Sequence, residues 1–360
     1  MPRLVRPLRI CHVVASVVVA AAVLGACAPE RSGQAATTDR RSTTTASADT
    51  ASTTGAADAS CQRPPAGRGG AIGEHAVGRA DRTVVDTSRA TVAPPALADR
   101  AAPSRTLPLV VLYPAKGTGD TSGASTAGAE PSTDGPFPLL VHSHGLGGWG
   151  DERIEMLARW ASAGYVVVAP TFPLSSRSSD PSDLANQPTD LAFVVQQIRA
   201  AAGDSSDVLH GLVRTDCVAL SGHSLGGGTT MTAAYDTCCT SIHPAAVIDI
   251  AGVLVERTAG AQLADMAPIP VLLVHGDADQ RVPYEQSEQK ARLLHGPTWF
   301  LTFTGGGHSD MFTPPRVAFL DESVIAFLDA QLQGAPARLD ALPGVVSASG
   351  LATLQVLQRR

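Results

Sequence analysis

The chain has 360 residues, of which 44% are hydrophobic and 17% charged, a composition that excludes a disordered protein. Its net charge of -6 lacks the basic excess with which nucleic-acid binders displace counterions, so no nucleic-acid partner is expected. The length permits one large domain or two ordinary ones.

The N-terminus has the pattern of an export signal. Three arginines within the first nine residues precede an uncharged, mostly apolar run of 15 residues, Ile10–Leu24. This run is short for a bilayer-spanning helix but typical of a signal peptide. It leads into Leu24-Gly-Ala-Cys27, which resembles the lipobox of bacterial lipoproteins and implies that a lipid is attached to Cys27. We therefore expect an exported protein that is lipid-anchored to the cell membrane and faces outside the cytoplasm. An ordinary signal peptide or an uncleaved anchor is the alternative.

Residues 28–60 are rich in Ser, Thr, Ala and Asp and contain almost no large apolar side chain. Such a segment buries too little surface to fold. We therefore expect residues 1–26 to be the signal peptide and residues 27–69 to be the lipidated cysteine with a disordered tether. Residues 70–360 should form one domain, and we expect a monomer.

From residue 70 onward, short apolar runs alternate with helical patterns. Eight strands are predicted, at Arg82–Asp86, Leu107–Tyr113, Phe137–His142, Tyr165–Ala169, Cys217–Ser221, Ala246–Ile250, Val271–His275 and Thr298–Phe303. Helices are predicted at Asp151–Ala163, Leu184–Ala201, Ser224–Tyr235, Tyr284–Leu294 and Pro315–Gln331. The later strands are almost continuously apolar, which is typical of parallel strands buried on both faces. The sequence thus predicts an α/β protein with a mostly parallel eight-stranded sheet and helices on both faces. The glycine-rich segment 117–135 is expected to be a surface loop.

The strongest chemical signal is Gly222-His-Ser-Leu-Gly226, which follows a predicted buried strand and opens a predicted helix. A G-x-S-x-G sequence in this context predicts a nucleophile elbow, a sharp turn that raises the Ser224 hydroxyl at the end of the sheet. The two glycines stand where a Cβ would clash with neighbouring backbone. An inert serine in a tight turn is the alternative.

A serine nucleophile needs a histidine base and an acid that orients it. In this architecture the acid precedes the histidine, and both follow the serine. The loop after the strand Val271–His275 offers two acids, Asp277 and Asp279. The glycine-rich loop after the next strand presents His308, the expected base. His295 also lies beyond the acids, but it closes a helix, where a cation interacts favourably with the helix dipole.

An oxyanion hole requires two backbone N–H groups directed at the developing negative charge. Leu225 directly follows the nucleophile and should supply one of them. Leu146, in the loop His142-Ser-His-Gly-Leu-Gly-Gly-Trp149, should supply the other. The histidines at 142, 144 and 223 are assigned to packing or to holding this loop, so neither a metal nor a cofactor is expected.

Several segments together resemble α/β-hydrolases of the platelet-activating-factor acetylhydrolase, dienelactone-hydrolase-like and polyester-hydrolase (cutinase-type) group. The segments are Ser143-His-Gly-Leu-Gly147, Ala163-Gly-Tyr-Val-Val-Val-Ala169, Gly222-His-Ser-Leu-Gly-Gly227, Gly276-Asp-Ala-Asp-Gln-Arg-Val-Pro283 and Gly306-Gly-His308. The resemblance implies that the acid is Asp279, three residues after the glycine, and that Asp277 braces its loop. It also implies the α/β-hydrolase fold. The stretch Ile250–Met266 has no room for a large lid, so little or no lid is expected. Dienelactone hydrolases proper use a cysteine nucleophile, so Ser224 argues against that activity.

These motifs predict a serine carboxylic-ester hydrolase that acts on an ester or lipid substrate through an acyl-enzyme. A phospholipase A2-like lipase of the acetylhydrolase type and a polyester hydrolase are the alternatives within that class. A non-catalytic binding lipoprotein on a hydrolase scaffold is the alternative outside it.

Four cysteines remain once Cys11 and Cys27 are assigned to the signal peptide and the lipid. In an exported protein they are expected to form disulfides. The helix after Ser224 should return the chain to the start of the preceding strand. We therefore expect Cys217 to pair with Cys238 or Cys239, leaving Cys61 with the other cysteine or free.

Overall fold

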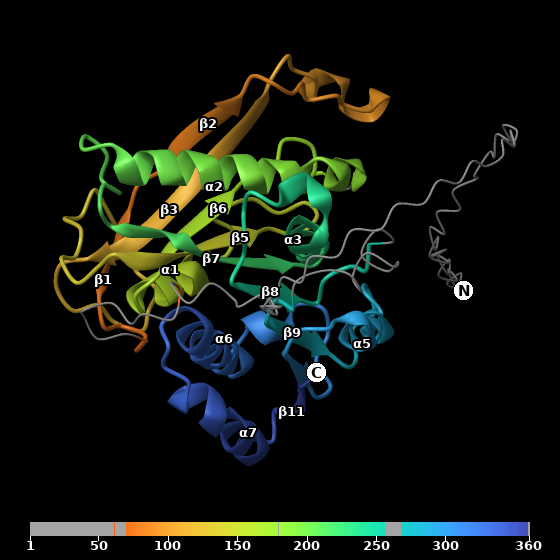
Figure 1. Cartoon of the computed structure of the whole chain (residues 1–360). Helices are drawn as coiled ribbons and strands as arrows, with labels where there is room; N and C mark the ends of the chain where they lie inside the picture. The colour runs from red at the N-terminus through yellow and green to blue at the C-terminus, as the bar shows by residue number, and fades with distance from the viewer. Residues whose placement is uncertain (1–60, 62–69, 179, 256–267, 359–360) are drawn as a thin grey trace, which may run out of the picture. The chain divides into compact units, whose positions relative to one another are not determined.

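The computed structural model describes Cys61 and residues 70–178, 180–255 and 268–358 (Figure 1). All of these residues fall in one compact unit. The predicted signal peptide, the lipidation site Cys27 and nearly all of the tether lie outside the described residues. No helix in the described ranges is long and apolar enough to cross a membrane.

The described chain forms a mostly parallel sheet of 11 strands. All eight predicted strands are present: β2 (Arg82–Asp86), β3 (Arg105–Ala115), β5 (Phe137–Ser143), β6 (Val166–Pro170), β7 (Val213–His223), β8 (Ala246–Ile250), β9 (Val271–Gly276) and β10 (Thr298–Phe303). The predicted count of eight is nevertheless wrong, because β1 (Ala76–Arg79), β4 (Thr126–Ala127) and β11 (Ala352–Leu357) also join the sheet.

The strands lie in the order β11-β10-β9-β8-β7-β5-β6-β3-β1-β4, with β2 paired to β3. From β6 to β10 every neighbouring pair is parallel, whereas β3 and β11 run antiparallel to their neighbours β6 and β10. The strands missed from the sequence lie toward the two edges of the sheet. An edge strand has one side without a neighbour, so it does not need the continuous apolar run that marks a central strand.

Helices cover both faces of the sheet (Figure 1). The five predicted helices are α1 (Ile154–Ser162), α2 (Gln187–Gly203), α3 (Leu225–Tyr235), α5 (Tyr284–Leu293) and α6 (Arg316–Leu332). A further helix, α7 (Ala337–Ser349), contains Pro343, which obscured its pattern. Helices α1, α6 and α7 share one hydrophobic cluster with one face of the sheet, and α2 shares another with the opposite face. The described chain also contains short 3-10 helices: η1 (Pro95–Arg100), η2 (Ser182–Ala185), η3 (Thr237–Cys239) and η5 (Asp310–Phe312).

The predicted disulfide between Cys217 and Cys238 or Cys239 is wrong. Cys217 instead pairs with Cys61, with their Cα atoms 5.0 Å apart, and Cys238 pairs with its neighbour Cys239.

The alternation of side chains along β7 explains the difference. Val218 packs in the cluster that contains α2, whereas Ala219 packs in the cluster of α1 and α6. Cys217 has the same parity as Ala219, and its Sγ lies 4.0 Å from the carbonyl oxygen of Leu332 at the end of α6. Cys239 lies in the cluster on the α2 face. Successive residues of a strand point to opposite faces, so the sheet itself separates Cys217 from Cys239.

Candidate active site

Ser224 lies at the turn between β7 and α3, with φ 57° and ψ -119°. A non-glycine residue with positive φ is strained by about 1–3 kcal/mol and persists only where its surroundings enforce it. Here the Ser224 N–H donates to the Ile250 carbonyl at 2.9 Å. A Cβ on Gly222 would collide with the Gly226 backbone, and a Cβ on Gly226 would collide with the Ser143 carbonyl. The two glycines therefore permit the turn, as the sequence predicts.

The structure brings the predicted serine, histidine and acid together. Ser224 Oγ lies 2.9 Å from His308 Nε2, and His308 Nδ1 lies 2.7 Å from Asp279 Oδ2. The three side chains follow the carboxyl ends of β7, β9 and β10, all on one edge of the parallel sheet. Strand-end loops of such sheets are where α/β proteins place their ligand sites.

The carboxyl of Asp279 is held from several sides. Its Oδ1 accepts the N–H groups of Arg281 at 2.8 Å and Val282 at 3.0 Å, so the loop itself fixes the side chain. Burial raises the pKa of Asp279, but the hydrogen bonds from His308 and these amides outweigh burial and lower the pKa overall. Asp279 is therefore ionised at neutral pH.

The alternative acid Asp277 and the alternative base His295 are not part of this hydrogen-bonded chain. Asp277 Oδ1 accepts the Gly305 N–H at 2.6 Å, so this acid braces the loop that carries the histidine, as the resemblance implies. His295 is exposed beyond the end of α5.

The loop after β5 lies against the nucleophile, since a Cβ on Gly145 would come within 3.3 Å of Ser224 Cβ. In that loop the Gly147 N–H donates to Ser175 and the Gly148 N–H donates to Gly145. Among the described residues, the N–H of Leu146, which directly precedes Gly147, has no hydrogen-bond acceptor.

The Leu225 N–H, at the first position of α3, likewise donates to no described residue. The first N–H groups of a helix lack intrahelical partners and carry partial positive charge. The predicted oxyanion-hole amides at positions 146 and 225 are thus unengaged.

The other histidines near the site are held in neutral, hydrogen-bonded positions. Burial lowers the pKa of His142 to about 3 and that of His144 to about 4. His144 Nε2 accepts the Phe172 N–H and its Nδ1 donates to the Gly145 carbonyl, which fixes the loop. His223 Nε2 donates to the carbonyl of His308 at 3.2 Å.

No group of three or more His, Cys, Asp or Glu residues in the described chain could hold a metal ion.

The sequence did not point to His275, which is buried beside the acid, with its Nε2 3.0 Å from Asp279 Oδ2. A histidine that ends an apolar strand looks like a core residue in the sequence. The only signal in the sequence is the spacing His275-Gly-Asp-Ala-Asp279, because a tight turn of this length can bring the acid back to the histidine at the end of the strand.

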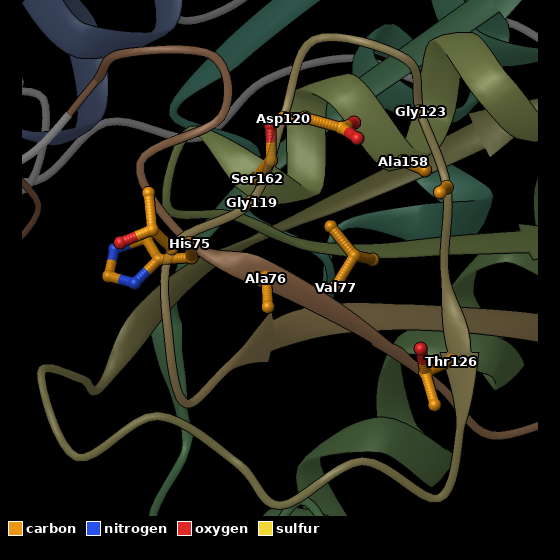
Figure 2. Close-up of a pocket in the computed structure, with 11 residues that line it drawn as sticks. His75, Ala76, Val77, Gly119, Asp120, Gly123, Thr126, Ala158 and Ser162 are labelled. Atoms are coloured by element: carbon orange, nitrogen blue, oxygen red, sulfur yellow. The ribbon is translucent and has the colours of Figure 1, made fainter.

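A separate pocket of about 230 Å³ lies between β1 and α1, away from these residues (Figure 2). His75, Asp120 and Ser162 are among its lining residues. The Ser162 hydroxyl is already engaged, because it accepts the Gly73 N–H and donates to the Arg159 carbonyl. The residues that line this pocket do not include Ser224, Asp279 or His308.

The structure of a ferulic acid esterase from Streptomyces cinnamoneus superposes with a TM-score of 0.59, covering 82% of this chain and 99% of that one at 22% identity. The chain has the α/β-hydrolase fold. A family model described as Chlorophyllase matches residues 122–272, which is less than half of the chain. The structural match shows the fold that the resemblance in the sequence implies.

The curated relatives match a short segment of this chain. The uncharacterized protein YfhR of Salmonella typhimurium is 31% identical over 75 residues, and its Escherichia coli K12 counterpart is 32% identical over 66 residues. These segments are 21% and 18% of this chain and 26% and 23% of the relatives. The chain thus spans about a quarter of the length of these relatives.

Proposed function

We propose that the protein is a serine carboxylic-ester hydrolase in which Ser224 is the nucleophile, His308 the general base and Asp279 the orienting acid. One observation carries the proposal: the unbroken hydrogen-bonded chain from Ser224 Oγ through both ring nitrogens of His308 to Asp279 Oδ2. Each member has the chemistry that its place requires, because an imidazole between a hydroxyl and an ionised carboxylate can accept the hydroxyl proton.

The reaction begins when Ser224 Oγ attacks the ester carbonyl carbon and His308 Nε2 takes the hydroxyl proton. The carbonyl oxygen becomes an oxyanion, and the N–H groups of Leu146 and Leu225 stabilise it. Asp279 keeps the imidazole in the tautomer with its proton on Nδ1 and stabilises the imidazolium that forms.

Collapse of the tetrahedral intermediate breaks the bond to the alcohol, which leaves with the proton that His308 returns. The acyl group is now on Ser224. Water then attacks this acyl-enzyme while His308 accepts a proton from it, and the second collapse releases the carboxylic acid and restores the serine.

The setting of the enzyme is also part of the proposal. The lipobox-like segment at Cys27 supports an exported protein that is lipid-anchored to the cell membrane and faces away from the cytoplasm. Such an anchor would place the site beside lipid, so a phospholipase A2-like lipase remains the second candidate. Polyesters are further candidate substrates because the sequence resembles polyester hydrolases. Ferulate esters are candidates because the structural neighbour is a ferulic acid esterase.

An ester panel tests the proposal. Purified wild type and Ser224→Ala would be assayed with short-acyl nitrophenyl esters, ferulate esters, phospholipid vesicles and a polyester film. We expect wild type to hydrolyse at least the short-acyl esters and Ser224→Ala to lose about 10⁴-fold or more of kcat. Comparable turnover by both proteins would contradict the assignment of Ser224, and no turnover by either would favour a non-catalytic binding lipoprotein.

A further inference from the structure

A second imidazole lies behind the acid of the proposed site. His275, near the end of β9, is fully buried, and its Nε2 lies 3.0 Å from Asp279 Oδ2. This is the same oxygen that His308 Nδ1 reaches at 2.7 Å. One carboxylate oxygen therefore stands between two histidine rings.

The partners of His275 fix its tautomer. Its Nε2 faces two acceptors, Asp279 Oδ2 and, at 3.1 Å, the carbonyl oxygen of Val282, so this nitrogen must carry a proton. Its Nδ1 lies 2.7 Å from the hydroxyl of Ser287 on α5. A hydroxyl can donate to the bare nitrogen of a neutral ring, and Ser287 is as buried as His275. The ring is thus a neutral donor directed at the acid.

Burial does most to keep the His275 ring neutral. Burial lowers its pKa most, and Lys290 on α5 lowers it further against the opposing charges of Asp249 on β8 and Asp279. Lys290 and Asp249 form a buried ion pair. The Tyr284 ring makes a T-shaped contact with His275, with the ring centroids 5.7 Å apart.

We propose that His275 is a positioning residue that shares the Asp279 carboxylate with His308 and thereby limits the basicity of His308. This inference rests on the proposed function. A hydrogen-bond donor on Oδ2 takes up part of the negative charge that would otherwise stabilise the His308 imidazolium. Asp279 keeps its place without His275, because the Arg281 and Val282 amides hold Oδ1. Removal of the donor should therefore change the charge that His308 experiences more than the position of the acid.

The test compares His275→Phe, which keeps a planar ring but removes the donor, with His275→Gln, whose side-chain amide can still donate. The readout is the pH profile of kcat/KM for a soluble short-acyl ester, whose acid limb reports the pKa of the base in the free enzyme. We expect the midpoint of that limb to rise by about 0.5–1 pH unit in His275→Phe and to stay near the wild-type value in His275→Gln. A uniform loss of activity with an unmoved midpoint in His275→Phe would reduce His275 to a packing residue.

A second measurement needs no substitution. In nitrogen-15 spectra of the wild-type histidines, His275 should show a protonated Nε2 and a bare Nδ1 across the whole pH range of activity. A ring that ionises in this range, or one protonated on Nδ1, would overturn the proposal even if His275→Phe fails to fold. Failure of the proposed function would instead leave wild type inactive on every ester, or Ser224→Ala active.

Discussion

Replacing Asp279 by asparagine should lower kcat by about 10⁴-fold while leaving KM within a few-fold of wild type. An amide at this position keeps the size of the side chain but lacks the negative charge that stabilises the imidazolium. It can also present an NH2 group to His308 Nδ1, which favours the wrong tautomer of the base. Steady-state kinetics on a short-acyl ester measure both parameters.

Asp277→Asn is the matched control, because it makes the same chemical change two residues away. The carboxyl of Asp277 accepts only the Gly305 N–H among the described contacts, and an asparagine carbonyl can still accept it. Its kcat should stay within a few-fold of wild type. A large loss in Asp277→Asn together with a small loss in Asp279→Asn would reverse the assignment of the acid.

The second large effect concerns stability and arises at a buried arginine. Arg105 on β3 is fully buried, with its Nε 2.7 Å from Asp190 Oδ1 and its Nη2 2.9 Å from Asp183 Oδ1. Asp183 in turn accepts the Leu174 N–H at 3.1 Å, and Asp190 also pairs with Arg89 at 2.6 Å. The arginine thus joins β3 to η2, α2 and the loop after β6.

Arg105→Met should lower the free energy of unfolding by about 3–5 kcal/mol, because it leaves a carboxylate buried without its main partner. Arg82→Met is the control. The Arg82–Asp207 pair is partly exposed, with 22% and 23% of the side chains accessible, and its loss should cost about 1 kcal/mol or less. Guanidinium unfolding of both variants measures the difference, and equal losses would show that the buried network contributes no more than a surface pair.

The pH dependence gives this prediction a second readout. Burial raises the pKa of Asp190 despite the opposing effect of Arg105 and Arg89, and loss of Arg105 should raise it further. A carboxyl whose pKa is raised in the folded state destabilises the fold above that pKa, and the penalty falls as the pH drops toward it. The stability deficit of Arg105→Met should therefore be smaller at about pH 5.5 than at about pH 8.

The parts of the fold that could be predicted are those in which local sequence dictates local geometry. Continuous apolar runs mark the central strands because both faces of a parallel strand are covered. The glycines on either side of Ser224 mark the elbow because no larger residue fits there. Chain order then places Asp279 and His308 on the loops of neighbouring strands, where the structure has them.

The parts that could not be predicted depend on side-chain direction and register. β7 begins at Val213 rather than at Cys217, so Cys217 lies within the strand and not at its start. A change of one residue in a strand also reverses the face to which a side chain points, and Cys217 points to the face opposite Cys239. The contact between His275 and Asp279 likewise depends on how the loop after β9 turns back.

Covalent labelling with a fluorophosphonate tests the central claim most directly, because the reagent phosphonylates a serine only when an adjacent base activates it. After labelling of the full chain, peptide mapping by mass spectrometry locates the adduct. We expect one adduct, on the peptide that contains Ser224, and none on Ser224→Ala at the same reagent concentration. An adduct on a different residue, or labelling that persists in Ser224→Ala, would contradict Ser224 as the nucleophile.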